Sequence, residues 1–503
     1  MKITRSLISI FLVLTMLFSF VACSGGSTSD VKDTTASNES KAPDSDTTVS
    51  GIEYEADGLP DSLNFGGAKV SILSPGHGMS LNDITVEELS SEVILDSIYN
   101  RELFVEDRLG VEIENYKPLD NDGEILKQIA SGEDTHQIFV GETYDFSKYS
   151  LDGVLFDLWG VENLDLNKPW WSSLFIEEAS IGDSLYVATG SITLSLLRNL
   201  MVVYYNKNLA ENYCQNNDAL GELGDLYSLV ENGGWTLDKL HAFSSEVYED
   251  VNGSTTRDEE DVYGLGVHYF SLDAIWSSFD LNILSTTDDG WFELEVNTDK
   301  LFNALEKTTD LLHNSGGVYL VDNMTQVSST SGMFASGRYL FAIDYLYISE
   351  SAALRNMADE YGVLPFPKLD ENQKEYFSYA YDTYLSYAIP NTNPSPEIAG
   401  AVMEALASYS YRNTAPAYLD TALKGKYMND PQSRRMVDIV VNNFKLDTAW
   451  IYIFTLGASY PADYRNNIYE NKRTFASEHQ TNSRAVNRSL IGNKIKYEAN
   501  LKN

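Results

Sequence analysis

The chain has 503 residues, with 74 Asp and Glu against 35 Lys and Arg, which gives a formal net charge of −39 at pH 7. A surface this acidic argues against nucleic acid as a partner, because nucleic-acid binding rests on the neutralisation of phosphates by Lys and Arg. Long-range repulsion also disfavours strongly anionic ligands, so neutral or cationic solutes remain.

The N-terminus has the pattern of an export signal. Two basic residues precede an apolar run over residues 7–22 that ends directly on Cys23. The run is shorter than the roughly 20 residues that a membrane-spanning helix needs. It resembles the lipobox of bacterial lipoproteins, in which the cysteine is diacylated and becomes the new N-terminus, although Phe20 replaces the usual leucine. We expect 1–22 to be a signal peptide and Cys23 to be a lipid anchor on the extracellular face of the cell membrane; a secretory signal with an incidental cysteine is the alternative.

Residues 23–58 are mostly Ser, Thr, Asp, Gly and Lys. Such a segment buries too little apolar surface to offset the entropy of ordering, so we expect a disordered linker. Cys214 is the only other cysteine, which leaves no disulfide framework and no zinc site. We expect residues 59–503 to form the folded part. This segment is longer than a domain with a single hydrophobic core usually is, so two lobes are expected.

The first third of this part alternates strands and helices. Such alternation indicates βαβ units and a mainly parallel sheet, in which ligands bind beyond the carboxyl ends of the strands. Loops 74–77 and 141–143 fall at that place. The predicted strands are 68–73, 111–116 and 137–140, and the predicted helices are 87–109 and 124–130.

Further elements follow along the chain. We predict helices at 235–248, 298–313, 396–408 and, with a basic character, 484–500, and strands at 264–270, 339–343 and 384–389. Repeats, sustained heptads and spanning segments are absent from the sequence.

Several motifs together resemble the extracellular solute-binding proteins of ABC importers, family 1, the maltose-binding-protein-like group. One strand ends in Tyr205-Asn206-Lys207, which in that family carries the chain from one lobe to the other. The resemblance covers most of residues 60–460, and each motif is weak by itself. The matching segments, in order, are Asp183–Ala188, Val202–Leu209, Gly234–Leu240, Met333–Ala342 and Tyr361–Pro367.

The resemblance implies an α/β, two-lobe periplasmic-binding-protein-like fold (type II) with an interlobe cleft and hinge strands. It places lobe 1 at about 60–190 and 376–425, and lobe 2 at about 200–368 and 430–503. It further implies a monomeric, non-enzymatic component of an ABC importer that captures a carbohydrate, with a neutral oligosaccharide as the expected ligand, and delivers it to the permease subunits.

Sugars offer hydroxyls to polar side chains and flat C–H faces to aromatic rings. Several such side chains follow strand ends or crowd the crossover near residue 380, and the family places a cleft aromatic near Trp276. For each aromatic residue, packing in the core is an equal alternative. The predicted ligand-binding set is Glu142, Trp276, Asp344, Tyr345, Asp382 and Tyr384.

An acidic loop at 250–261 suggests a calcium site. Oxygen-bearing side chains occupy the positions that an EF-hand-like loop uses, although Thr255 replaces the usual glycine. An acidic, solvated turn is the alternative. The candidate Ca²⁺ ligands are Asp250, Asn252, Ser254, Asp258 and Asp261.

Two rival functions remain open on the sequence: a lipid-anchored extracellular glycoside hydrolase and a polysaccharide-binding surface protein. The sequence contains no Gly-x-Ser-x-Gly, no His-Glu-x-x-His and no phosphate loop. A glycosidase needs only two carboxylates without a local signature, so motifs do not decide against it.

Overall fold

The computed structural model describes residues 55–321, 327–420, 430–453 and 459–501. These belong to one compact unit, Ile52–Asn503. Cys23, the signal peptide and most of the predicted linker lie outside the described residues. Within the described part, none of the helices combines the length and the apolar character that a membrane crossing requires.

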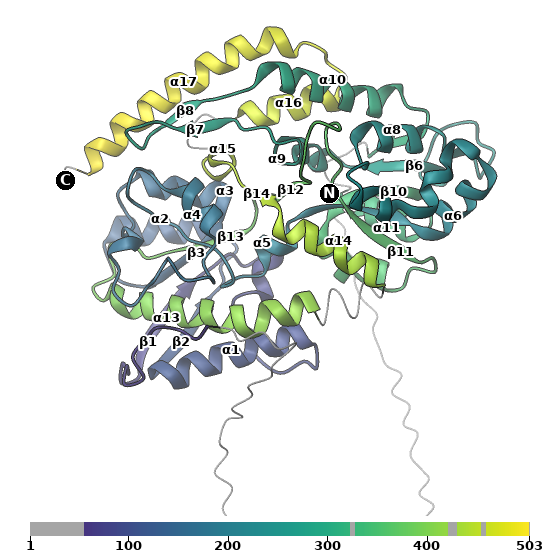
Figure 1. Cartoon of the computed structure of the whole chain (residues 1–503). Helices are drawn as coiled ribbons and strands as arrows, with labels where there is room; N and C mark the ends of the chain where they lie inside the picture. The colour runs from purple at the N-terminus through teal and green to yellow at the C-terminus, as the bar shows by residue number, and fades with distance from the viewer. Residues whose placement is uncertain (1–54, 322–326, 421–429, 454–458, 502–503) are drawn as a thin grey trace, which may run out of the picture. The chain divides into compact units, whose positions relative to one another are not determined.

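A four-stranded sheet, here called the N-sheet, is built mainly from the first third of the chain (Figure 1). β1 is parallel to both β2 and β3, while β13 arrives from much later in the sequence and is antiparallel to β3. Helices α1 (Val93–Leu109) and α2 (Asn121–Ser131) connect the parallel strands, which confirms the predicted βαβ units. The strand order is β13 (Leu385–Ala388), β3 (Ile138–Glu142), β1 (Ala68–Leu73) and β2 (Val111–Tyr116).

The second sheet, here called the C-sheet, has six strands. β10 is parallel to β6 and antiparallel to β4. Every residue of β4, β6 and β10 is buried, as expected for central strands that are covered on both faces. The order is β11 (Tyr361–Pro365), β4 (Met201–Asn206), β10 (Tyr339–Tyr345), β6 (Val262–Val267) and β5 (Tyr248–Glu249), and β9 (Val318–Leu320) also pairs with β6.

The chain passes between the two sheets in segments that lie side by side. Leu200 forms a β-bridge with Ala380. β12 (Ser378–Tyr379) pairs in parallel with β14 (Phe444–Lys445). The crossing segments around 200, 380 and 445 are therefore hydrogen-bonded neighbours at the junction of the two sheets.

The longer predicted helices form largely as expected. α10 (Thr298–Asn314) begins where the Asn297 side chain accepts a hydrogen bond from the Lys300 amide at 3.1 Å, and it buries leucines at helical spacing. The predicted helix at 87–109 starts only at Val93. The Asp96 carboxylate accepts the Ser90 amide at 2.7 Å and holds the preceding loop in a turn.

Other boundaries also differ from the prediction, and the helix predicted at 484–500 already begins at Phe475. The predicted strand at 264–270 ends at Val267, because His268 caps a 3₁₀ turn, Tyr269–Ala274, through its ring Nδ1 and the Ser271 amide. α8 (Leu237–Ser245) is shorter than the predicted helix at both ends.

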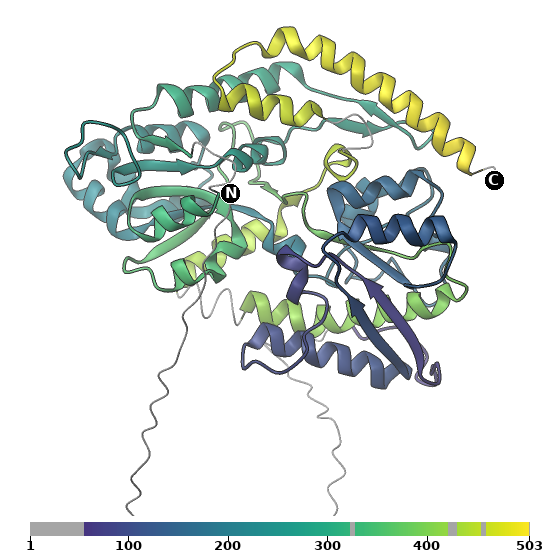
Figure 2. The same cartoon turned by 180° about the vertical axis from the view of Figure 1, so that it is seen from behind.

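The remaining helices cover the sheets and their junction (Figure 2). They are α3 (Thr143–Phe146), α4 (Ser173–Ala179), α5 (Ser195–Arg198), α6 (Lys207–Asn216), α7 (Leu226–Glu231), α9 (Ile275–Ser278), α11 (Val327–Ala335), α12 (Ala352–Arg355), α13 (Pro396–Tyr409), α14 (Pro431–Asn442), α15 (Thr448–Ile451), α16 (Ser459–Tyr469) and α17 (Phe475–Asn500). A short hairpin, β7 (Leu284–Thr286) with β8 (Phe292–Leu294), contacts α17.

Candidate functional site

The carboxyl ends of β3 and β10 meet the crossing segment 379–384. The amide of Tyr144, just after β3, donates to the carbonyl of Asp382 at 3.1 Å. The ring of Tyr345, the last residue of β10, lies 5.4 Å from the ring of Tyr381 between centroids. Residues from both sheets therefore converge on one crossing segment, at the edge where α/β sheets bind ligands.

Half-buried aromatic rings form the surface of this junction. The rings of Tyr345 and Tyr347 stack at 5.4 Å with an interplanar angle of 17°. Phe270 packs edge-on against Tyr381 at 5.7 Å and against Tyr269 at 5.2 Å. Tyr345 is almost wholly buried, whereas the other four rings keep part of their surface exposed. Such a set offers flat apolar faces together with hydroxyl groups.

Arg465 on α16 fixes part of this aromatic surface. Its guanidinium forms an ion pair with the fully buried Asp273 and lies 4.4 Å from the ring centroid of Tyr269 and 5.2 Å from that of Phe270. Burial raises the pKa of Asp273 to about 6, and Arg465 opposes that rise. The ion pair with Asp273 therefore fixes a guanidinium that contacts both rings.

Two further carboxyl groups lie beside the aromatic rings. Asp382 is 8% exposed, and burial raises its pKa well above the usual range; the carboxylate of Asp273 adds to the rise, while Arg465 opposes it. Burial also raises the pKa of Glu142, whose Oε1 lies 3.9 Å from Nδ1 of His77. A protonated carboxyl can donate one hydrogen bond and accept others, which suits it to a ligand hydroxyl.

Two cavities open next to these residues. One of about 190 Å³ is lined by His77, Glu142 and Tyr144, from the loops after β1 and β3 that the sequence singled out. A second of about 440 Å³ is lined by Tyr347 and Glu350, which follow β10, and by residues of segment 78–95. Each cavity is thus bordered by a loop at the carboxyl end of a sheet strand.

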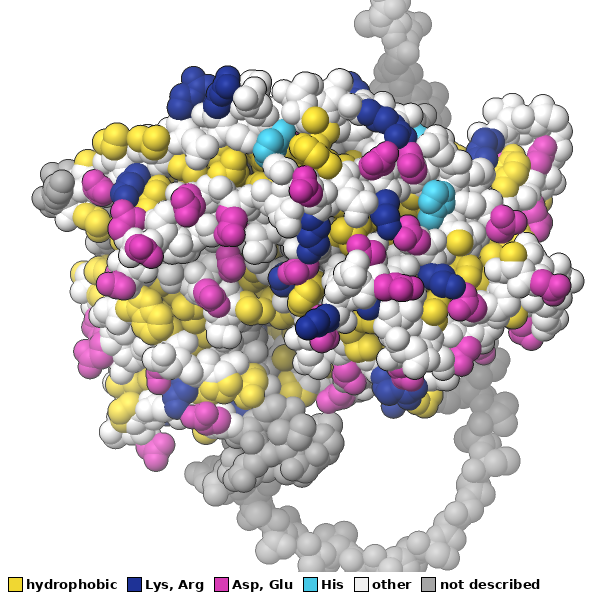
Figure 3. All heavy atoms as spheres, turned by 45° about the horizontal axis from the view of Figure 1, so that its top comes forward, with side chains coloured by type: hydrophobic (Ala, Val, Ile, Leu, Met, Phe, Trp, Pro, Cys, Tyr) yellow, Lys and Arg dark blue, Asp and Glu magenta, His cyan; other side chains and the backbone are white. Residues whose placement is uncertain are grey.

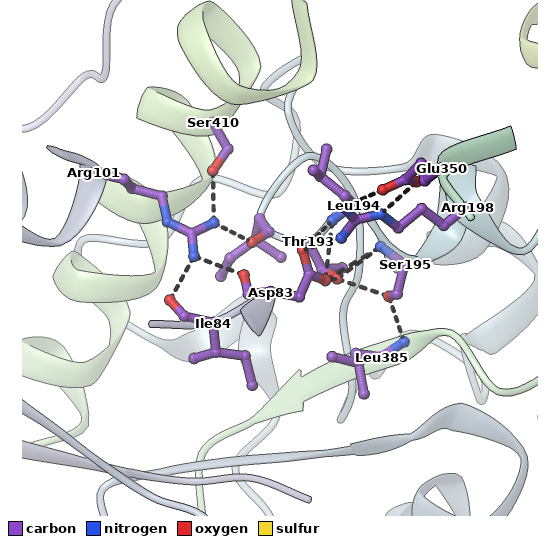
Figure 4. A network of polar contacts seen from close by, with 11 residues as sticks. Asp83, Ile84, Arg101, Thr193, Leu194, Ser195, Arg198, Glu350, Leu385 and Ser410 are labelled. Carbon is purple, nitrogen blue, oxygen red and sulfur yellow. Dashed lines mark hydrogen bonds and ion pairs between the residues drawn. The ribbon is translucent and has the colours of Figure 1, made fainter. Parts of the chain in front are cut away.

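A polar network supports the second cavity (Figure 4). The fully buried Asp83 carboxylate accepts the amides of Leu194 and Ser195 at 3.0 and 3.2 Å. Arg198, in the same crossing segment, donates from Nε and Nη2 to the Glu350 carboxylate at 3.0 and 2.9 Å. The network ties the loop after β1 and the turn after β10 to one crossing segment.

Arg101 strengthens this network from α1. Its guanidinium donates to the backbone carbonyls of Asp83, Ile84 and Ile192 and to the hydroxyl of Ser410, at 2.6 to 2.9 Å. These charge-assisted bonds hold the loop after β1 in place, so the cavity wall built from that loop is rigid.

The structure brings four of the six predicted ligand-binding residues together, namely Glu142, Asp344, Tyr345 and Asp382. The Oδ1 atom of Asp344 lies 3.6 Å from Nε2 of His268, whose ring is 5.6 Å from that of Tyr345. The rings of Trp276 and Tyr384 pack into the core instead, although the Tyr384 carbonyl adjoins the group by accepting the Thr143 amide at 2.9 Å. Trp276 is 1% exposed against Tyr464, and Tyr384 is 2% exposed against Phe175. Ligand contact stays a prediction for all six.

Sequence reasoning left several residues of the junction out of the predicted set. Tyr269 and Phe270 come just after the end of β6 at Val267. Ligands of α/β sheets bind beyond the carboxyl ends of the strands, so a correct end for this strand would have indicated both residues. Arg465 lies almost two hundred residues beyond its partner Asp273 and carries no local signal. The omitted residues are Tyr269, Phe270, Tyr347, Tyr381 and Arg465.

The acidic loop at 250–261 forms a hydrogen-bonded turn. The Asp250 carboxylate accepts the amides of Gly253 and Thr255 at 2.7 and 3.0 Å. Asp258 accepts from Asn252 and from Ser254, and the buried Asp261 accepts the hydroxyl of Tyr248. The described residues contain no group of three or more His, Cys, Asp or Glu side chains that could hold a metal ion. The candidate calcium ligands thus accept hydrogen bonds from the loop's own donors, and calcium binding at this loop stays a prediction.

No protein-family model and no curated protein sequence matches this chain. Among solved structures, it is similar to a cyclo/maltodextrin-binding protein complexed with maltotetraose, with a TM-score of 0.53, 13% identity, and coverage of 88% of this chain and 98% of that one. This similarity confirms the predicted α/β fold of the periplasmic-binding-protein-like kind.

Two further solved structures are similar at a TM-score of 0.48. One is an ABC substrate-binding protein from Listeria monocytogenes in complex with cycloalternan, with 12% identity over 85% of this chain and 98% of that one. The other is a receptor of Streptomyces glaucescens, solved unliganded and with acarbose, with 11% identity over 86% of this chain and 99% of that one.

Proposed function

We propose that this chain is the extracellular solute-binding component of an ABC importer and that it captures a neutral oligosaccharide between its two sheets. In this proposal the solute stacks on the half-buried rings of Tyr269, Tyr347 and Tyr381, and its hydroxyls bond to Glu142 and Asp382. The protein binds and releases its solute without chemical change.

One observation carries the proposal: partly exposed aromatic faces and buried carboxyl groups gather at the carboxyl ends of strands from both sheets. Stacking needs flat rings, and hydroxyl recognition needs planar polar groups. The fold shared with a maltodextrin-binding protein is consistent with this role. Ligand contacts to both sheets would favour a closed arrangement of the two predicted lobes, which the permease then recognises.

The proposal includes attachment to the outer face of the cell membrane through lipid on Cys23. The support is the signal pattern that ends on this cysteine. Metabolic labelling with an alkyne fatty acid tests it. The wild type should take up label and sediment with membranes, and Cys23→Ser should do neither. Equal labelling of both proteins would contradict the anchor.

Binding is tested on purified protein lacking residues 1–22 and carrying Cys23→Ser. Saturating maltotetraose and other neutral oligosaccharides are screened by thermal shift, because a ligand of the native form raises Tm. For a hit, Tyr347→Ala and Tyr381→Ala should each weaken the affinity by about 30-fold, since a stacked ring contributes about 2 kcal/mol.

Tyr213→Ala is the matched control, because Tyr213 is a half-buried tyrosine on α6, outside the proposed site. Equal affinities for all three variants would remove the site assignment. Mass spectrometry of the recovered sugar completes the test: shorter products would favour the glycoside hydrolase over the binding protein.

A further inference from the structure

The C-terminal helix α17 leaves two large aliphatic side chains in solvent. Val486, Leu490 and Tyr497 form its buried face. On the opposite side, Ile491 is 63% exposed and Ile495 is 64% exposed. Figure 3, which brings the α17 side of the folded unit forward, shows hydrophobic side chains at the surface among charges of both signs. Two exposed isoleucines one helical turn apart indicate an interaction surface.

These isoleucines belong to a continuous stripe, here called the outer seam: Arg484, Arg488, Ile491, Ile495 and Glu498. All five residues are exposed. Successive members are four and three residues apart, which is the spacing of the a and d positions that form the seam of a coiled coil. The seam therefore has the geometry for packing against another helix.

The charged side chains beside the outer seam form ion pairs, whereas those within the seam form none with the described part of the chain. Lys494 and Lys496 flank the seam and form ion pairs with Asp289 and Asp152. Among the described residues, Arg488 and Glu498 have no ion-pair partner. The seam thus presents two guanidinium groups, of Arg484 and Arg488, before the two isoleucines and one carboxylate, of Glu498, after them, and none of the three has an ion-pair partner among the described residues.

This arrangement is complementary to itself when two helices run antiparallel. A two-fold axis through position 493 places Ile491 of one copy opposite Ile495 of the other, and Arg488 of one copy opposite Glu498 of the other. We propose that the chain forms a homodimer through antiparallel packing of α17 along the outer seam. This departs from the monomer expected from the sequence.

A second copy fits the outer seam better than an anionic lipid surface does. Glu498 lies within the seam, and Asp288, Asp289 and Glu293 line the groove beside it, so lipid phosphates would meet several carboxylates. A single helix pair buries less than about 1,000 Å², which corresponds to a weak, reversible dimer. Tethering to one membrane raises the local concentration and favours such a dimer.

Sedimentation velocity over a range of concentrations tests the proposal on the chain from residue 23 with Cys23→Ser. The wild type should show reversible dimerisation. Arg488→Glu and Glu498→Arg should each raise the dimer Kd at least about tenfold, because each turns two attractive contacts into repulsive ones. Arg434→Glu, an equal charge change at an exposed residue of α14, should leave the Kd unchanged.

Two combinations separate antiparallel pairing from a general charge effect. The doubly reversed protein with both substitutions should dimerise like the wild type. An equimolar mixture of the two single variants should form a heterodimer more tightly than either variant forms a homodimer. A wild type that stays monomeric at about millimolar concentration, or a mixture that does not associate, overturns the proposal. Phosphatidylglycerol vesicles that bind a monomeric wild type would assign the seam to lipid instead. Neither result bears on solute binding.

Discussion

Glu404 gives the sharpest test of how burial controls the stability of this protein. It lies on α13 and is 1% exposed. Its Oε2 accepts the indole N–H of Trp171 at 3.0 Å and the amide of Asp165 at 3.3 Å, while Oε1 has no hydrogen-bond partner among the described residues. Burial raises the pKa of Glu404 from 4.5 to about 7.

The sign of the effect follows from proton linkage. Below pH 4.5 the carboxyl is protonated in both the folded and the unfolded chain. Between pH 4.5 and about 7 the unfolded chain releases this proton and the folded chain keeps it, so stability falls as pH rises. At 1.36 kcal/mol for each pH unit of difference, Glu404 lowers the free energy of unfolding by about 2.5 kcal/mol between pH 5 and pH 8.

Glu404→Gln removes the titration while it keeps the shape and the oxygen that accepts the Trp171 N–H. Urea unfolding of both proteins at several pH values between 5 and 8 measures the difference. The free energy of unfolding of the wild type should decline more steeply than that of the variant, by about 2.5 kcal/mol across the range. The carboxyls of the half-buried Glu102 and the buried Asp447, whose pKa values also rise to about 7, act equally in both proteins. Parallel pH profiles would refute this reasoning.

Three other outcomes are expected. Glu350→Gln removes the bidentate partner of the 9%-exposed Arg198 and leaves Asp83, 3.8 Å from its Nη1, as the remaining ion-pair partner, so urea unfolding should show a loss of about 2 kcal/mol; a loss below about 0.5 kcal/mol would contradict this. Gly190→Ala places a Cβ 2.3 Å from the carbonyl oxygen of Trp170, so a calorimetric Tm should fall by several degrees, and an unchanged Tm would argue against this packing. Chelation with EDTA should leave Tm unchanged, because loop 250–261 is held by its own hydrogen bonds; a lower Tm would support the calcium site.

Local sequence patterns predicted much of the fold. β1 and β2 have the predicted bounds, and α10 and α13 end within one residue of prediction, because apolar periodicity and capping residues act over a few residues. The same patterns placed Glu142 and Asp344 at strand ends, where the structure also has them. The late start of α1 and the early end of β6 follow from local side-chain hydrogen bonds, Ser90 to Asp96 and Ser271 to His268, which apolar periodicity does not reveal.

The sequence by itself therefore determined the alternation of strands and helices, the mainly parallel character of the N-sheet and the strand ends at which a site should form. Only the tertiary structure decided which aromatic residues remain partly exposed there. Trp276 and Tyr381 are each followed by two polar residues in the sequence. Even so, α16 packs over Trp276, whereas Tyr381 stays partly exposed. That choice depends on α16, almost two hundred residues after Trp276, which buries one ring and brings Arg465 to Asp273. Burial is a property of the whole packed chain, and no local spacing encodes it.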